Sequence, residues 1–293
     1  MAAAPSIESF LADVGEAVRR DASHLEGLFA VFAQEARFGR TWLAPSLARL
    51  APGAAVLEVG AGLGLLSCQL AKEGFTVTAL EPVGEGFSSF TELQSVVLAC
   101  ARAQGIAPRV LPLAVERLDE DSRFDFAYSV NVMEHVQDVA LALQTIARAL
   151  RPGAEYRFVC ANYLFPYEPH FDIPTVFSKR LTEKLFRRRI YGNRRVGDAA
   201  GVWKSLNWIT VPQVARAARA LPGVSVSFDR SVLEAALLRV VDDREFSARR
   251  SPLVRGLVRT AVGLRLHRLV KWIPAFMQPL MDCSIRRRAQ AHG

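Results

Sequence analysis

Short apolar segments alternate with longer amphipathic ones through the middle of the chain. The short segments, rich in valine, alanine, leucine and phenylalanine, occupy residues 56–59, 76–80, 109–113, 124–130 and 156–160. Between them, apolar positions recur with helical spacing at 65–72, 86–103 and 139–150. Each helical stretch is long enough for a right-handed crossover between parallel strands, so the pattern predicts an α/β fold with a doubly wound, mostly parallel sheet.

Two amphipathic helices are predicted ahead of this alternation. Apolar positions between Ile7 and Val18 follow a helical period behind a cap residue, Ser6, and a similar pattern runs through residues 25–32. We therefore interpret residues 1–50 as an N-terminal helical segment.

One long segment interrupts the alternation. Residues 161–211 are rich in aromatic residues, proline and arginine, and a loop of that length is usually a lid or a binding element. A helix at 212–221 and a strand at 224–228 follow it. We expect a core over residues 51–230 that carries a lid insertion at 161–211.

The C-terminal region is predicted to form two consecutive amphipathic helices and a last strand at 280–285. The first helix sets Val254, Leu257, Val258, Ala261 and Val262 against Arg255 and Arg259, and the second sets Leu266, Leu269, Val270 and Ile273 against Arg265, Arg268 and Lys271. We interpret residues 231–278 as a helical cap insertion and residues 279–293 as the final strand and a basic tail.

The charge balance points to an anionic partner. The chain has 37 basic and 29 acidic residues, which gives a net charge of +8 and a pI near 9.7. A phosphorylated substrate, nucleic acid or an acidic membrane face would each suit that balance. Because the sequence has neither a signal-peptide pattern nor an apolar run of spanning length, we expect a cytoplasmic protein. Peripheral contact with the inner face of the membrane stays open.

A glycine-dense turn follows the first predicted strand. The segment 56–64 reads Val-Leu-Glu-Val-Gly-Ala-Gly-Leu-Gly, and glycines let the backbone turn tightly and approach a ligand. A dinucleotide fold would place its third glycine at position 65, which is leucine. With Glu58 two residues ahead of Gly60, the turn resembles motif I of the class I S-adenosylmethionine-dependent methyltransferases.

This resemblance implies that the cofactor is S-adenosyl-L-methionine and that the sheet has seven strands with a reversed final hairpin. The cofactor would lie against Gly60, Ala61, Gly62 and Gly64, and the Glu58 carboxylate would face its cationic methionine end, directly or through water. Residues 224–228 and 280–285 fit the last two strands.

Three further segments match the family's order. Glu81, with Pro82 after it, ends the second strand 21 residues after Gly60, where an acidic residue of the family accepts both ribose hydroxyls. The adenine position falls at residues 113–118, which lack the aspartate of many members, so recognition falls to the Val115 N–H group or to Glu116.

The fourth segment, 124–136, resembles the family's fourth strand with its Glu-His-Val ending. It would bring residues 131–135, among them Asn131, Val132 and His135, to the methyl group. His135 is a candidate general base for a hydroxyl acceptor. The alternative is that His135 only fixes the turn into the next helix.

The acceptor is expected near residues 162–171, where Glu168 and His170 are flanked by aromatic residues and prolines. Such a pair could act as a titratable couple beside the methyl group. The alternative is a proline-rich surface loop with solvated charges. We predict no metal site, because Cys68, Cys100, Cys160 and Cys283 are scattered without metal-ligand spacing, although Glu134 and His135 leave a divalent ion open.

These features favour methyl transfer to a hydrophobic or lipid-linked small molecule that is apolar or anionic, for example a phosphorylated isoprenoid or glycan. The basic amphipathic helices suggest an anionic membrane surface as a partner, and packing of their apolar faces onto the core is the alternative. An RNA methyltransferase is the second hypothesis, although the Asp/Asn-Pro-Pro-Tyr/Phe tetrapeptide of base-amino methylation is absent after residue 130. A non-catalytic binding partner is the third. The sequence does not indicate an oligomeric state.

Overall fold

We analysed a computed structural model of the chain, which describes residues 6–82, 88–193, 196, 198–248 and 250–289. Two compact units make up the chain. Unit 1 consists of Met1–Ser129, Arg148–Tyr156 and Ala289–Gly293, and unit 2 of Val130–Ala147 and Arg157–Arg288.

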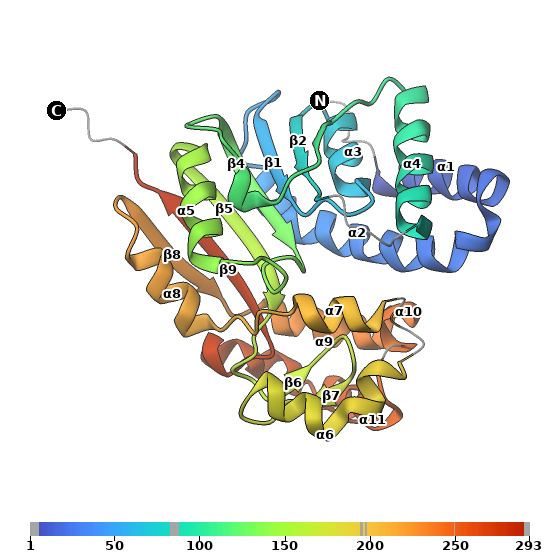
Figure 1. Cartoon of the computed structure of the whole chain (residues 1–293), viewed down its shortest axis with the longest axis vertical. Coiled ribbons are helices and arrows are strands. Elements are labelled where there is room, and N and C mark those ends of the chain that lie inside the picture. The colour runs from blue at the N-terminus through green and yellow to red at the C-terminus, as the bar shows by residue number, and fades with distance from the viewer. Residues whose placement is uncertain (1–5, 83–87, 194–195, 197, 249, 290–293) are drawn as a thin grey trace. The chain divides into compact units, whose positions relative to one another are not determined.

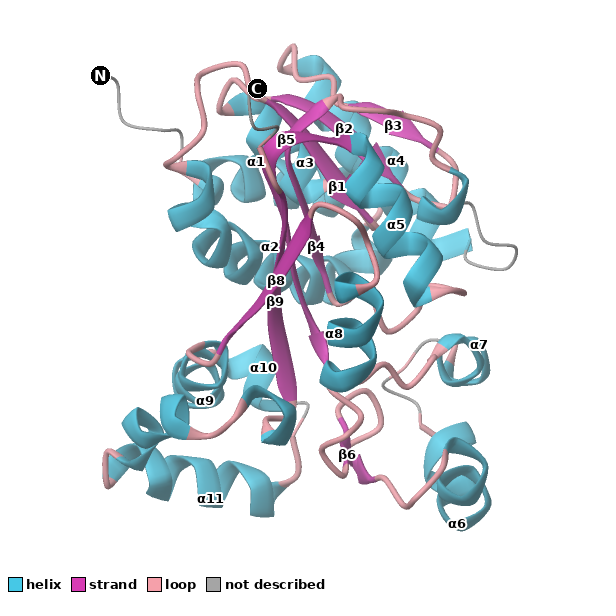
Figure 2. Ribbon diagram, turned by 90° about the vertical axis from the view of Figure 1, so that its left-hand side faces the viewer, coloured by secondary structure: helices cyan, strands magenta, loops and turns pink. Residues whose placement is uncertain are grey.

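A seven-stranded sheet confirms the predicted fold class. Its strands are β1 (Ala55–Val59), β2 (Thr76–Leu80), β3 (Arg109–Leu111), β4 (Phe124–Val130), β5 (Leu150–Ala161), β8 (Val224–Asp229) and β9 (Leu280–Arg287). They follow the order β3-β2-β1-β4-β5-β9-β8 and are drawn in magenta in Figure 2. The β1–β2, β1–β4 and β2–β3 pairs are parallel, whereas β8 and β9 pair antiparallel. The sheet is therefore doubly wound, with the reversed hairpin that the resemblance implied.

Unit 1 places helices around β1 to β3. They are α1 (Ile7–Asp21), η1 (Ser23–Leu25), α2 (Glu26–Leu47), α3 (Leu65–Lys72), α4 (Ser88–Ala103) and the short 3₁₀ turn η2 (Val115–Arg117). The Ser6 side chain accepts a hydrogen bond from the Glu8 N–H group, as its predicted role as a cap requires. Helix α1 packs against α2 and α4, and its apolar face is buried (Figure 1). The predicted helix 86–103 is described from Ser88 onward; residues 83–87 lie outside the described part.

The remaining helices lie mainly in unit 2. They are α5 (Val139–Ala149), which unit 1 shares, α6 (Lys179–Tyr191), α7 (Ala199–Ser205), α8 (Val211–Arg219), α9 (Val232–Asp242), α10 (Arg244–Ala248), α11 (Pro252–Gly263), η3 (Leu266–Trp272) and η4 (Ala275–Met277). A short antiparallel pair, β6 (Tyr167–Glu168) and β7 (Ile173–Pro174), precedes α6. The predicted lid segment 161–211 thus holds two short strands and two helices.

Three sequence predictions need correction. Strand β5 begins at Leu150 rather than at residue 156, so it includes Pro152 and Gly153, which the sequence pattern had assigned to the end of the preceding helix; strands tolerate proline near their first position. The second predicted amphipathic helix is a 3₁₀-helix, η3, so its faces repeat at a different period. In α11, Leu257 was placed on the face with Val254 and Val258, but its side chain is 64% exposed.

One buried ion pair joins β5 to β9 within unit 2. The Arg157 guanidinium donates from Nε to Asp282 Oδ1 at 3.0 Å and from Nη2 to Oδ2 at 2.6 Å. Asp282 is 2% exposed. A bidentate pair of this kind is geometrically specific, and losing one member removes two charge-assisted hydrogen bonds from a largely buried position.

Replacing Asp282 with alanine is expected to lower the free energy of unfolding by about 3–5 kcal/mol, because it removes the buried carboxylate that binds the Arg157 guanidinium through two hydrogen bonds. Chemical denaturation with the unfolding followed by circular dichroism measures the change. Asp21→Ala is the matched control, since it removes an exposed pair with Arg20 and should leave the midpoint nearly unchanged. Equal effects of the two substitutions would contradict this role of Asp282.

Candidate functional site

The glycine turn after β1 has a backbone that other residues rarely adopt. Gly60, Gly62 and Gly64 have φ angles of +70°, +55° and +80°. These values lie in the left-handed region, where a Cβ is costly. Two contacts within unit 1 fix the turn: the Ala61 N–H group donates to the Leu80 carbonyl at 2.9 Å, and Gln94 Nε2 donates to the Gly62 carbonyl at 2.7 Å. The turn is thus a preformed bend in which three of the five positions, 60–64, carry no side chain.

Glu58 lies in β1, two residues before Gly60. Its side chain is almost fully buried, and the Ser67 hydroxyl of α3 donates a hydrogen bond to Oε2. Burial raises the pKa of Glu58 to about 8, and the Ser67 hydrogen bond opposes that rise. Glu58 therefore ties α3 to β1, and a cation beside it would favour its ionised form.

Glu81 follows β2 and reaches back to the glycine turn. Its Oε2 accepts a hydrogen bond from the Gly62 N–H group at 2.7 Å, and its own N–H group donates to the Leu111 carbonyl at 3.1 Å. Burial raises the pKa of Glu81, and the Gly62 hydrogen bond lowers it. The structure brings Glu81 and the glycine turn together, as the predicted ribose site requires. Pro82 is exposed beside it.

The predicted adenine and methyl segments have distinct local structures. In unit 1, Val115 is buried at the start of η2, and Glu116 is partly exposed. In unit 2, Asn131 has a φ of +55° and donates its N–H to the Val159 carbonyl at 2.8 Å; Val132 next to it is partly exposed. Asparagine tolerates this left-handed conformation better than most residues.

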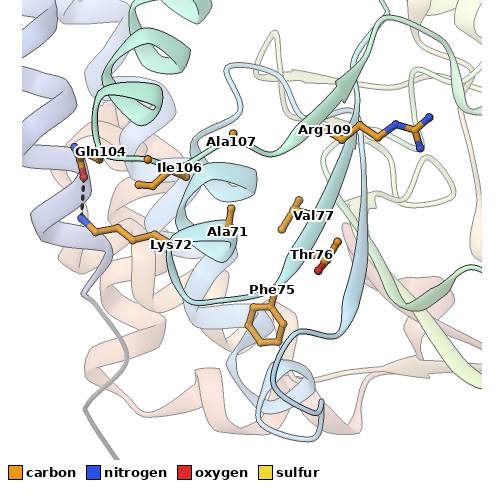
Figure 3. A pocket seen from close by; sticks show the side chains of 10 residues that line it. Ala71, Lys72, Phe75, Thr76, Val77, Gln104, Ile106, Ala107 and Arg109 are labelled. Carbon is orange, nitrogen blue, oxygen red and sulfur yellow. Dashed lines mark hydrogen bonds between the residues drawn. The ribbon is translucent and has the colours of Figure 1, made fainter.

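Topology puts the unit 1 elements at one edge of the sheet. Strands β1, β2 and β3 are parallel neighbours, so the glycine turn, Glu81 and η2 all follow carboxyl ends. Ligands of open α/β sheets bind at that edge. A shallow cavity in unit 1 lies instead at Thr76 and Arg109, the first residues of β2 and β3, with Lys72 and Gln104 hydrogen-bonded beside it (Figure 3). It is therefore at the opposite edge from the glycine turn.

Unit 2 contains a cluster of titratable side chains around Glu168. This carboxylate is 0% exposed. Its Oε1 accepts hydrogen bonds from His170 Nδ1 at 2.6 Å, from the His170 N–H group at 3.1 Å and from the Tyr163 hydroxyl at 3.2 Å, and its Oε2 accepts one from the Phe171 N–H group at 2.7 Å. These donors, above all His170, hold the pKa of Glu168 below its usual value despite burial. The alternative of a loop with solvated charges is therefore wrong for Glu168.

The pKa values of the two histidines of the cluster shift in opposite directions. Glu168 raises the pKa of His170 against the effect of burial, because the carboxylate stabilises the imidazolium. Burial lowers the pKa of His135 to about 4, and the charge on His170 adds to that effect. His135 Nδ1 is 2.8 Å from the Ser205 hydroxyl, and the two rings meet edge to face with centroids 5.4 Å apart.

Glu134, which the sequence analysis left open as a ligand of a divalent ion together with His135, is a further member of this cluster. It is 1% exposed, burial raises its pKa to about 7, and its Oε2 accepts no hydrogen bond from the described residues. Ligand atoms of Glu134, His135 and His170 lie within 4.8 Å of one another, so these three could hold a divalent ion. The Glu-His-Val motif drew attention to Glu134 in the sequence, but only the fold shows that Glu134 lies close to His170.

Aromatic side chains of unit 2 surround the cluster. Tyr163 stacks on Trp208 with centroids 5.4 Å apart, and Phe171 meets Trp203 edge to face at 5.7 Å. Asn162 anchors the segment by donating to the Gln278 carbonyl at 2.7 Å. Residues 162–171 are therefore held by packing and hydrogen bonds rather than lying loose.

Parts of the chain are similar in sequence to known methyltransferases. A sequence profile described as a methyltransferase domain matches residues 33–167. An uncharacterised protein of Mycobacterium tuberculosis is 48% identical over 96% of this chain and 95% of its own length. A ubiquinone biosynthesis O-methyltransferase of Rhizobium leguminosarum is 34% identical, over only 40% of this chain and 42% of its own length.

Solved structures show the same fold at low identity. A phosphoethanolamine N-methyltransferase of Haemonchus contortus, in complex with S-adenosyl-L-methionine, is 14% identical over 86% of this chain and 52% of its own, with a TM-score of 0.51. An S-adenosylmethionine-dependent methyltransferase of Mesorhizobium loti is 18% identical over 84% of this chain and 97% of its own, with a TM-score of 0.50.

Substitution of Glu81 tests the ribose site. Glu81→Ala is expected to weaken S-adenosylmethionine binding by roughly 10- to 100-fold, the value of a lost hydrogen bond to a charged group. Glu81→Gln is the matched variant, since its amide oxygen can still accept from Gly62 and hold the turn. We expect it to weaken binding less than alanine does. Calorimetric titration measures both affinities, and unchanged binding by the alanine variant would remove Glu81 from the site.

Proposed function

Because this chain belongs to the class I S-adenosylmethionine-dependent methyltransferase family, we propose that it methylates a hydroxyl group of a hydrophobic or lipid-linked small molecule. The hydrogen-bonded pair of Glu168 and His170 is the observation that carries this proposal. A hydroxyl must lose its proton to act as a nucleophile, and an imidazole held by a carboxylate is suited to accept it.

The cofactor supplies a methyl group on an electrophilic sulfonium. The residues of unit 1 fit it: a backbone without Cβ atoms at Gly60, Gly62 and Gly64 lets the methionine and adenosyl parts approach closely. Glu81 would accept the ribose hydroxyls, and Val115 and Glu116 follow the next strand, where the family holds adenine. Glu58, in the strand before the turn, would face the cationic methionine end of the cofactor.

His170 is proposed as the general base. Its Nδ1–H is committed to Glu168, so Nε2 is the nitrogen that accepts the acceptor's proton. Glu168 then stabilises the imidazolium, and since the His170 side chain is 27% exposed, the proton can pass to water. His135, whose pKa lies near 4, would stay neutral and orient the acceptor together with Ser205.

The apolar character of the acceptor rests on the surroundings of this pair. Tyr163, Phe171, Trp203 and Trp208 present aromatic faces within unit 2. Partial similarity to ubiquinone biosynthesis O-methyltransferases supports an oxygen acceptor of this kind. None of the helices in the described part of the chain is long and apolar enough to cross a bilayer.

Replacing His170 with asparagine is expected to reduce kcat about 10²- to 10⁴-fold, because the general base is lost. The affinity for S-adenosylmethionine should stay unchanged, because His170 is not placed against the cofactor. Transfer of a labelled methyl group to hydroxylated isoprenoid acceptors measures the rate.

His135→Asn is the matched control and should cost less than His170→Asn. A larger loss in the His135 variant would contradict the assignment of the base. Chelation with EDTA should leave the rate unchanged; loss of activity that zinc or magnesium restores would assign Glu134, His135 and His170 to a metal centre instead.

The pH profile tests the same pair independently. The base must be neutral to work, and Glu168 raises the pKa of His170 above its usual 6.5, so kcat is expected to fall as the pH drops through a value above 6.5. In Glu168→Gln the acidic limb should move to lower pH, because the carboxylate that stabilises the imidazolium is gone. A wild-type limb at or below 6.5 would contradict the proposed pairing.

A further inference from the structure

The segment between Glu245 and Asp282 carries positive charge and no negative charge. Residues 246–281 contain no aspartate or glutamate, and they contain seven basic residues: Arg249, Arg250, Arg255, Arg259, Arg265, Arg268 and Lys271. Arg249 lies outside the described residues. A stretch of this composition repels cationic and attracts anionic partners.

Helix α11 packs by one face only. It contacts α9 and η3, and Val254, Val258, Ala261 and Val262 are partly buried. Figure 2 shows α11 beside α9. With about 3.6 residues per turn, Leu253, Leu257 and Leu264 share another face. These leucines are 71%, 64% and 65% exposed, and no residue of α11 is fully buried. The helix therefore presents a leucine stripe to its surroundings.

The 3₁₀-helix η3 has three faces, one of packed, one of exposed apolar and one of exposed basic side chains. Because a 3₁₀-helix has about three residues per turn, side chains three apart eclipse each other. His267, Val270 and Ile273 form the packed face. Leu266, Leu269 and Trp272 form an apolar face with exposures of 48%, 58% and 72%. Arg265, Arg268 and Lys271 form an exposed basic face beside it.

We propose that these residues form a docking surface for an anionic lipid bilayer. The docking surface consists of Leu253, Leu257, Leu264, Leu266, Leu269 and Trp272, with Arg265, Arg268 and Lys271. Interfacial helices combine one apolar face with lysine and arginine, and tryptophan is enriched at the depth of lipid headgroups. The cationic face attracts the headgroups, while the leucines and Trp272 enter the boundary with the acyl chains.

The composition favours lipid over a protein partner. Residues 246–281 contain seven basic residues and no acidic one, so a layer of anionic headgroups complements the whole segment, whereas a protein partner would have to be acidic across its contact face. Docking does not depend on methyl transfer, but it would present unit 2 to a lipid-linked acceptor of the kind proposed above.

Flotation of the full chain with vesicles tests the proposal. The protein is expected to float with phosphatidylcholine vesicles that contain phosphatidylglycerol, and much less with phosphatidylcholine alone. Raising the salt concentration should reduce binding, because the surface charges are screened. Emission from Trp272, the most exposed of the four tryptophans, should shift to the blue on binding and lose that shift in Trp272→Phe.

Two pairs of variants separate docking from general effects. Leu257→Glu is expected to lower the vesicle partition coefficient at least tenfold, which is about the value of one buried leucine. Leu141→Glu, on an exposed leucine of α5, is its control. Arg268→Gln with Lys271→Gln should weaken binding roughly fivefold for each cation removed, and Arg216→Gln with Arg219→Gln on α8 is the charge-matched control.

Three results would overturn the proposal: no flotation with either vesicle, equal flotation of all variants, or a dimer in solution that Leu257→Glu dissociates while vesicles bind none of the protein. His170→Asn should float like the wild type. A protein that floats but does not methylate would therefore count against the proposed function alone, and one that methylates a soluble acceptor without floating would count against docking alone.

Discussion

Parallel strands that are neighbours in a sheet must end at the same edge, and the cofactor half of the site depends on this constraint. The residues after β1, β2 and β3 are far apart in sequence but follow strands that pair in register. Glu81, which follows Gly62 by 19 residues in the sequence, can therefore accept a hydrogen bond from the Gly62 N–H group. The left-handed backbone at Gly60, Gly62 and Gly64 then leaves space at this edge that side chains would fill.

The pKa values of the two buried carboxylates of unit 2 shift in opposite directions. Burial raises the pKa of Glu134 to about 7, although the charge on His170 and backbone hydrogen bonds oppose the rise, whereas the four hydrogen bonds that Glu168 accepts hold its pKa below its usual value despite burial. The charge of the cluster is consequently concentrated on the pair of Glu168 and His170. The same carboxylate raises the pKa of His170 while burial lowers that of His135, and the proposed choice of His170 as the base rests on this difference.

Local periodicity was sufficient to predict the strands from 56 to 130 and the helices between them, because buried runs and amphipathic runs differ in period. Periodicity did not predict that β5 begins at Leu150, and it did not predict that η3 is a 3₁₀-helix rather than an α-helix. No sequence signal distinguishes a 3₁₀ from an α-helical stripe over seven residues, so Leu266 and Leu269 were grouped with the packed Val270. Helix α11 shows the same limit: its apolar residues occupy two faces, and only packing against α9 selects one.

The site was predicted in part. Motif spacing indicated the glycine turn and Glu81, and the local pair Glu168 and His170 was visible in sequence, but the place of Glu134 beside His170 required the fold. The roles of these residues, the domain limits and a cytoplasmic location remain predictions. The central claim is that Glu168 keeps His170 basic, and the ¹⁵N chemical shifts of the His170 ring across pH test it most directly. The account predicts that Nδ1 stays protonated and that Nε2 loses its proton above pH 6.5. A His170 ring that titrates at or below 6.5, or one that releases its proton from Nδ1, would contradict it.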